Sequence, residues 1–181
     1  MKTYLDANIG TLKALKMVIA SIDDQEYQHI TKPAFQSSLG QHARHIVEHY
    51  QCFLKQVNQG KQFNYDLRCR DTRLENNRDI CIEEVDNIIA ELERFQILDI
   101  DVSISDDYSQ YGARSSICRE LMFLISHTEH HNAMIAAMRR LAGVEVDSEF
   151  GVANATLIHE KRVKLDANQG NKTAKIAINE S

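Results

Sequence analysis

The sequence predicts an all-α protein built as a four-helix bundle, and three observations support that prediction. Apolar residues recur at spacings of three and four over four long stretches of the 181-residue chain, which is the period of an amphipathic helix. The chain has one proline and seven glycines, so few residues interrupt these stretches. Serines precede two of the stretches and glycines follow two, as expected for helix caps.

The first two predicted helices lie on either side of a polar connection. The first covers about residues 3–22, after which two aspartates follow the last apolar positions. The connection contains Pro33, which cannot continue a helix. The second helix begins at Ser37 or Ser38, both good N-caps, and ends at Gly60.

The other two predicted helices follow longer connections. The third spans about residues 79–98, with isoleucine, valine and leucine side chains along one face. The fourth begins at Ser115 or Ser116 and runs to Ala142, because Gly143 supplies a C-terminal stop. Four helices of this length are sufficient for one domain with its own core.

The connections and the C-terminal tail differ in composition from the helices. Residues 61–78 are rich in arginine and aspartate. Residues 99–114 contain Asp-Val-Ser-Ile-Ser, an alternating pattern that predicts a short hairpin before the last helix. The chain is polar from residue 166 onward, which is typical of disorder. The sequence therefore predicts one helical domain over residues 1–165 and a polar, disordered tail over residues 166–181.

Composition and charge exclude several classes of function. The formal net charge is −5 and no basic stretch is dense enough to follow a phosphate backbone, so nucleic acid is not an expected partner. No stretch approaches the roughly 20 apolar residues that cross a bilayer, and the first residues lack the apolar core of a signal peptide. The four cysteines form no CxxC pair and are expected to be free thiols. We therefore expect a cytoplasmic protein with no membrane partner.

The histidines are the most informative residues of the chain. Residues four apart on a helix differ by about 40° in direction and lie about 5–6 Å apart at Cβ. Two imidazoles at that spacing can both reach one metal ion with bonds of about 2.0–2.1 Å. Six of the eight histidines fall in two windows on different predicted helices, which are His42, His45 and His49, and His127, His130 and His131.

Helical-wheel directions rank these histidines as ligands but leave one choice open. On the fourth helix His131 faces inward and His127 lies at the edge of the apolar face, while the third histidine of that window points outward. On the second helix His42 and His49 lie nearer the apolar stripe than His45. Three neutral imidazoles with an open position suit Zn, Ni, Fe or Mn. The alternative is that these are structural histidines, satisfied by carboxylates or carbonyls at helix interfaces.

Two motifs resemble the DinB-like (DinB/YfiT) superfamily of metalloenzymes. They are residues 38–50, Ser-Leu-Gly-Gln-His-Ala-Arg-His-Ile-Val-Glu-His-Tyr, and residues 126–133, Ser-His-Thr-Glu-His-His-Asn-Ala. The resemblance implies a four-helix bundle, often a homodimer, with a divalent metal, commonly Zn or Ni. It implies that the metal ligands are His45 from the second helix and His127 and His131 from the late HxxxH. The chain departs from the family at residues 132–134, where Asn-Ala-Met replaces a frequent Arg-Gly-Gln.

These observations predict a metal-dependent enzyme of the DinB-like type. The metal would activate a thiol or water for S-transferase- or hydrolase-like chemistry. The expected partner is a small-molecule substrate, with a low-molecular-weight thiol as a candidate, and the motifs assign no catalytic residue besides the ligands. The alternatives are a non-catalytic metal-binding or stress-associated helical protein and a helical interaction module whose histidines are structural.

Two further features have both a functional and a structural interpretation. The arginine-rich segment 65–75 predicts either a clamp for an anionic substrate or, as the favoured interpretation, a solvated loop of Arg–Asp pairs. Glu120 lies about 20° from His127 on the helical wheel, two turns earlier. It is expected either to orient a ligand imidazole or to form an ordinary surface or intrahelical pair.

Overall fold

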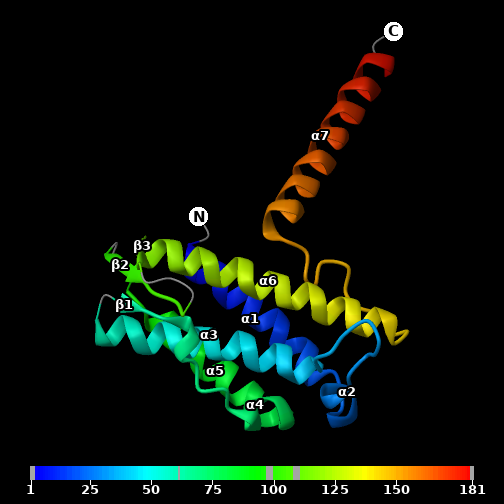
Figure 1. The fold of residues 1–181 in the computed structure, drawn as a ribbon. Helices are drawn as coiled ribbons and strands as arrows, with labels where there is room; N and C mark the ends of the chain where they lie inside the picture. The colour runs from blue at the N-terminus through cyan, green and yellow to red at the C-terminus, as the bar shows by residue number, and fades with distance from the viewer. Residues whose placement is uncertain (1–2, 61, 97–99, 108–110, 180–181) are drawn as a thin grey trace.

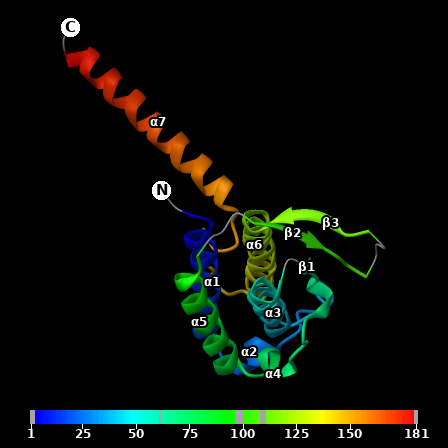
Figure 2. The same cartoon turned by 90° about the vertical axis from the view of Figure 1, so that its left-hand side faces the viewer.

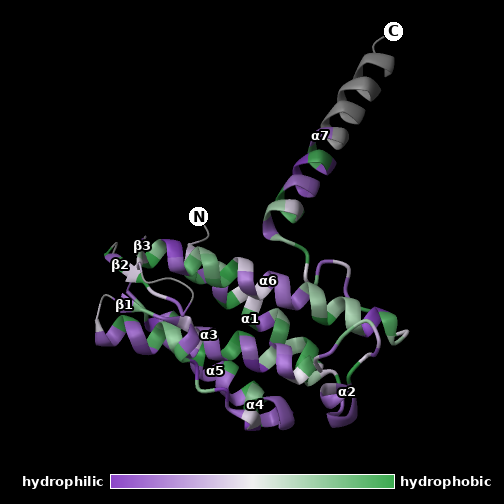
Figure 3. Ribbon diagram, in the orientation of Figure 1, coloured by the Kyte–Doolittle hydropathy of each residue, from purple (hydrophilic) through white to green (hydrophobic). Residues whose placement is uncertain are grey.

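Four long helices pack around a common core in the computed structural model, which describes residues 3–60, 62–96, 100–107 and 111–179. Helix α1 contacts α5 and α6, and α3 contacts the same two helices, so each has two long neighbours (Figures 1 and 2). Apolar and polar residues are interspersed along each helix (Figure 3), as amphipathic helices require. The four helices are α1 Tyr4–Ala20, α3 Leu39–Gln59, α5 Arg78–Arg94 and α6 Ile117–Leu141.

Capping side chains fix where these helices begin. Thr3 and Ser38 each form a capping box with an acidic or amide side chain three residues later, at the starts of α1 and α3. Ser116 accepts a hydrogen bond from a backbone N–H of the first turn of α6. Asn77 does the same for α5, which therefore begins at Arg78. Of the two alternatives at each predicted start, the structure uses Ser38 and Ser116.

The predicted helices lie at these positions, and the largest difference is at the end of the third. Helix α5 ends at Arg94, because the next residue, Phe95, adopts extended backbone angles as its C-cap. Residues 97–98 of the prediction lie outside the described residues. Fully buried side chains from all four helices form the core, and examples are Leu15, Phe53, Val85 and Leu121. Burying each such side chain stabilises the fold by roughly 1.5–3 kcal/mol.

A small three-stranded sheet lies near the C-terminal end of α3 and the start of α6 (Figure 1). Strands β2 (Asp101–Ile104) and β3 (Ala113–Ser116) pair antiparallel, which confirms the predicted hairpin before the last core helix. Strand β1 (Gln62–Phe63) pairs parallel to β2 and buries Phe63 against the core. The fold is thus mostly helical with a small sheet.

The remaining elements lie outside the four long helices. Three short segments carry the connections: α2 Asp24–Gln28, the 3₁₀ turn η1 Tyr65–Leu67, and α4 Thr72–Asn76. Helix α7, Asn154–Asn179, extends away from the rest of the protein (Figures 1 and 2) and has no counterpart among the predicted helices. It overlaps the segment after residue 166 for which the composition predicts disorder, and the domain boundary at 165 stays a prediction. None of the described helices combines the length and apolarity that crossing a bilayer requires.

Candidate metal centre

The two histidine windows of the sequence meet where α3 packs against α6. His45 on α3 and His127 and His131 on α6 each offer one ligand atom, and these three atoms all lie within 4.8 Å of one another. The spacing of four residues turns His127 and His131 to the same side of α6, with ring centroids 4.6 Å apart. The structure thus brings together the three residues that the family resemblance names. Their role as metal ligands stays a prediction.

The separations between these imidazoles fit a metal ion. The Nε2 atoms of His45 and His127 lie 3.1 Å apart. With metal–nitrogen bonds of about 2.0–2.1 Å, that separation corresponds to an angle of about 95–102° at the metal, close to tetrahedral. The ligand atom of His131 lies within 4.8 Å of the ligand atoms of His45 and His127. Three imidazole nitrogens are also a donor set that divalent transition metals prefer.

The protonation state of the three histidines suits the same role. Burial, reinforced by the neighbouring imidazoles, lowers the pKa of His45 to about 3, of His127 to about 2 and of His131 to about 3. The imidazoles are therefore neutral at pH 7, and only a neutral imidazole has a free lone pair for a metal. The cluster can accept a cation without first releasing protons.

His42 and His49, the alternatives that the helical wheel left open, lie beside this group. The Nδ1 atom of His42 is 3.0 Å from Nδ1 of His131, so one of these two nitrogens donates to the other. Nδ1 of His49 donates to the backbone carbonyl of His45 at 2.7 Å. Both side chains are more buried than His45, as the wheel predicted. The imidazole that offers a ligand atom within 4.8 Å of both His127 and His131 is nevertheless that of His45.

The side chain of Glu120 has neither of its two predicted roles, because it orients no ligand imidazole and is buried rather than part of a surface or intrahelical pair. Its carboxylate accepts hydrogen bonds from the Tyr65 hydroxyl at 3.0 Å and the Ser115 hydroxyl at 2.5 Å. Within the described part of the chain, Nδ1 of His127 is buried without a hydrogen-bond partner. Glu120 instead fixes Tyr65, whose ring stacks on His49 with centroids 5.5 Å apart.

Comparison with known families decides the relationship of the chain. A model described as DinB family matches residues 1–157. The chain belongs to the DinB family. It also resembles FK506-binding protein 5 of Rhizopus delemar, with 34% identity over 106 residues, which are 55% of this chain and 28% of that protein. The chain therefore covers less than a third of that relative's length, and the likeness concerns one part of it. Members of the DinB family bind divalent metals, and the three-histidine cluster of this chain can hold one.

A buried polar network supports the centre of this DinB-family protein. The Tyr50 hydroxyl donates to Oδ1 of Asn8 at 2.7 Å and lies 3.1 Å from the Thr128 hydroxyl. Asn8 in turn donates to the carbonyl of Leu121 at 3.1 Å, so the network joins α1, α3 and α6. Tyr50 and Thr128 directly follow His49 and His127 in the sequence, so this network lies one residue away from the histidines on both α3 and α6. A tyrosine and a threonine within apolar stripes were the sequence signal for it.

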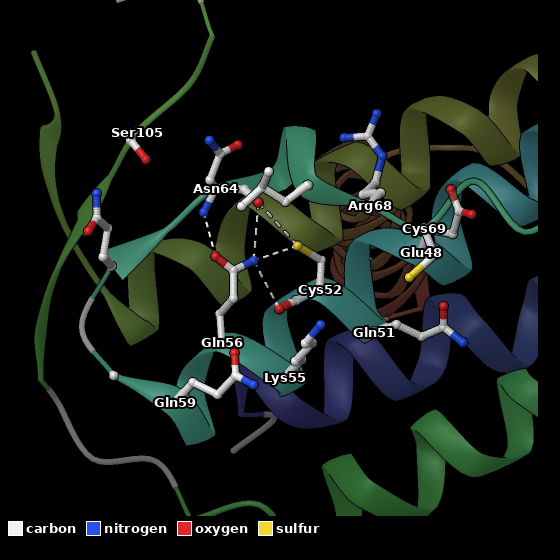
Figure 4. Close-up of a pocket in the computed structure, with 13 residues that line it drawn as sticks. Glu48, Gln51, Cys52, Lys55, Gln56, Gln59, Asn64, Arg68, Cys69 and Ser105 are labelled. Atoms are coloured by element: carbon white, nitrogen blue, oxygen red, sulfur yellow. Dashed lines mark hydrogen bonds between the residues drawn. The ribbon is translucent and has the colours of Figure 1, made fainter. Parts of the chain in front are cut away.

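The arginine-rich segment 65–75 contains two kinds of arginine. Arg73 forms a surface pair with the Asp71 carboxylate at 2.6 Å, as the favoured interpretation predicted. Arg68 instead turns toward the histidines, with Nη1 3.4 Å from Nε2 of His49. It also lines a pocket of about 660 Å³ beside the cluster (Figure 4). Sequence patterns could not separate the two arginines, because both alternate with aspartates in the same loop.

Proposed function

We propose that this DinB-family protein binds one divalent metal ion, zinc or nickel, through His45, His127 and His131. The observation that carries the proposal is the convergence of three neutral imidazoles, from two helices distant in sequence, within 4.8 Å. The match of the chain to the DinB family supports it. A metal bound there would lower the pKa of a thiol or water and supply a nucleophile near neutral pH.

The residues around the cluster suit a small-molecule reaction. Three protein ligands leave a coordination position open, which catalytic sites require. Tyr65 and Phe123 form an aromatic wall beside the histidines, with ring centroids 5.2 Å apart, and Phe123 lies 5.5 Å from the His127 ring. This wall limits the access of water from one side. We therefore propose S-transferase- or hydrolase-like chemistry on a small molecule, with a low-molecular-weight thiol as the candidate partner, in a cytoplasmic four-helix bundle.

One observation favours a second candidate, a non-catalytic metal-binding or stress-associated protein. The two buried glutamates near the cluster are both engaged elsewhere. Glu48 accepts from the backbone N–H of Asp71 at 2.6 Å, and Glu120 accepts from Tyr65 and Ser115. Neither carboxylate faces the histidines as a general base, so acid–base chemistry would have to come from the substrate or solvent.

Metal analysis of the purified protein tests metal binding directly. We expect about one equivalent of zinc or nickel per chain after incubation with either ion and gel filtration, measured by plasma mass spectrometry. His131→Ala removes a ligand and should lower the affinity at least 100-fold, because only two of the three proposed ligands remain. His130→Ala is the matched control, since its exposed side chain is adjacent in sequence and lies outside the converging group. A wild-type protein that binds neither zinc nor nickel after these incubations contradicts the proposal.

Turnover separates the catalytic candidate from the binding candidate. The zinc- and nickel-loaded proteins are incubated with a low-molecular-weight thiol and an electrophile such as 1-chloro-2,4-dinitrobenzene, and thioether formation is followed by absorbance. The enzyme proposal expects a metal-dependent rate that His131→Ala abolishes and His130→Ala preserves. A metal-loaded protein that turns over neither electrophiles nor hydrolysable esters favours the non-catalytic candidate.

A further inference from the structure

The loop between residues 64 and 71 is anchored to α3 at both ends, and these anchors fix the position of Arg68. At the first end the Gln56 side chain accepts from the backbone N–H of Asn64 at 2.5 Å and donates to its carbonyl at 3.2 Å. At the other end the buried Glu48 carboxylate accepts from the backbone N–H of Asp71 at 2.6 Å. Arg68 lies between these points and therefore has a defined position above the same helix.

The Arg68 guanidinium lacks an anionic partner. Its Nη1 donates to the Tyr65 carbonyl and lies 3.4 Å from Nε2 of His49, both of which are uncharged groups at neutral pH. Among the described residues, no carboxylate oxygen lies within 4.0 Å of it, and its Nε is buried without a hydrogen-bond partner. A half-buried guanidinium with an unused donor is costly unless an anion completes it. Arg73 of the same segment differs from Arg68, since it pairs with the Asp71 carboxylate at the surface.

The pocket beside Arg68 carries an excess of positive charge in its lining. Its lining contains the cations Lys55 and Arg68 and the single carboxylate of Glu48, whose charge is already met by the Asp71 N–H and by Arg44 at 3.9 Å. Side-chain amides, among them Gln51 and Gln56, cover much of the remaining wall (Figure 4). Such a lining suits a polar molecule that bears a negative charge.

The pocket follows the line of α3 that leads to the metal centre. Cys52, on the pocket wall, comes seven residues after His45, which places it about 20° around the helix and about 10 Å along its axis. Arg68 bridges the two regions, because it lines the pocket and contacts His49. A molecule of about 10 Å could therefore have one end in the pocket and the other at the histidines.

We propose that Arg68, assisted by Lys55, is the subsite for a carboxylate group of the substrate, and that the substrate of this centre is a small, polar, anionic molecule. This inference rests on the proposed function, because the other end of the substrate would react at the proposed metal centre. The carboxylate would accept hydrogen bonds from the free donor edge of Arg68, in the paired geometry that guanidinium groups favour. The subsite fixes binding and orientation, and it adds no chemical step.

Matched acids and esters test the subsite. Glutathione and N-acetylcysteine are compared with their ethyl and methyl esters, respectively, by titration calorimetry on the zinc-loaded and the metal-free full-length protein. We expect each acid to bind at least 10-fold more tightly than its ester to both forms, because the carboxylate contact does not need the metal. Arg68→Gln should remove this discrimination, and Lys55→Gln should reduce it about twofold to threefold.

Arg73→Gln is the control variant, because it removes an equal charge from the same loop at a surface pair. It should leave the acid-to-ester ratio unchanged, and circular dichroism should show that all three variants are folded. If the acids and esters bind equally, if no acid binds at millimolar concentration, or if Arg68→Gln keeps the ratio, the subsite is wrong. Metal content is measured on the same samples, so a protein that discriminates acids but takes up no metal contradicts the proposed function alone.

Discussion

Two polar clusters lie side by side between α3 and α6, and they differ in whether their hydrogen bonds are complete. In the network of Asn8, Tyr50 and Thr128 the side chains are fully buried, and each forms at least one hydrogen bond to a neighbour. In the neighbouring histidine cluster, ring nitrogens face one another, and Nδ1 of His127 has no hydrogen-bond partner among the residues that the structure describes. Tyr50 and Thr128 each follow a histidine of the second cluster by one position on α3 and α6, while Asn8 connects the first cluster to α1.

The difference distinguishes a structural cluster from one that is completed by a ligand. A complete buried network stabilises the folded chain by itself. Because its hydrogen bonds are already formed, a ligand would not increase its contribution to stability. Neutral imidazoles that face one another at 3.1 Å leave lone pairs that a cation would satisfy. Perturbing the first cluster should therefore change stability without changing metal affinity, whereas perturbing the second should mainly change metal affinity.

The largest expected effect is stabilisation by the metal itself. Zinc at 1,000 times its dissociation constant should raise the free energy of unfolding by about 4 kcal/mol, because it binds the folded site and not the separated histidines. Urea denaturation with zinc or with a chelator measures this increment. His131→Ala should lose it and Asn8→Ala should keep it. If zinc raises the free energy of unfolding of His131→Ala by the same amount, the metal binds elsewhere in the protein.

Asn8→Ala should give the largest loss of stability among substitutions in the structural cluster. Asn8 donates to the carbonyls of Tyr4 and Leu121 and accepts from Tyr50, and the last two of these hydrogen bonds are buried. Removing these contacts should cost about 2–3 kcal/mol in urea denaturation. Asn58→Ala is the control, because this exposed asparagine also donates to the carbonyl four residues earlier but has no tertiary partner of that kind. It should change stability by less than about 0.5 kcal/mol.

Much of the helical framework was predictable from the sequence because its signals are local. Apolar periodicity located the long helices, and capping residues such as Ser38 fixed their starts. The five-residue helices α2 and α4 are too short to show a period, and α7 lacks the apolar stripe of a core helix. These elements were therefore missed.

The candidate site was only partly predictable because it depends on how two helices meet. The spacing of His127 and His131 places them together on any helix, so local geometry was sufficient there. On α3 the wheel measures direction relative to the apolar stripe, and it favoured His42 and His49 over His45. Which ring nitrogens converge on α6 depends on how α3 packs against α6, and no single-helix pattern contains that information. The family resemblance supplied the choice that the wheel could not.

Acid should destabilise the metal-free protein through the histidine cluster. Burial lowers the pKa of His45 to about 3 and of His127 to about 2, whereas unfolded histidine titrates near 6.5. Below pH 6.5 the unfolded chain therefore binds more protons than the folded chain, and the free energy of unfolding falls as the pH decreases toward 4.

Urea denaturation with a chelator at pH 7.5, 6.5 and 5.5 measures the slope of the free energy of unfolding against pH. His127→Gln should make it shallower, and the exposed His130→Gln should not. Equal slopes in wild type and His127→Gln would show that the cluster is already protonated or open to water.

Thr128→Val should have the smallest effect and gives the sharpest separation of the two clusters. Valine keeps the shape of threonine but removes a hydroxyl that donates to the Leu124 carbonyl and contacts Tyr50. The loss should be about 1 kcal/mol, because Tyr50 retains its bond to Asn8 and no donor is left buried without a partner. The adjacent His127 keeps its place on α6, so zinc affinity measured by competition with a chelator should change less than threefold. A large loss of zinc affinity would mean that the hydroxyl network positions the imidazoles, and the two clusters would then act as one unit.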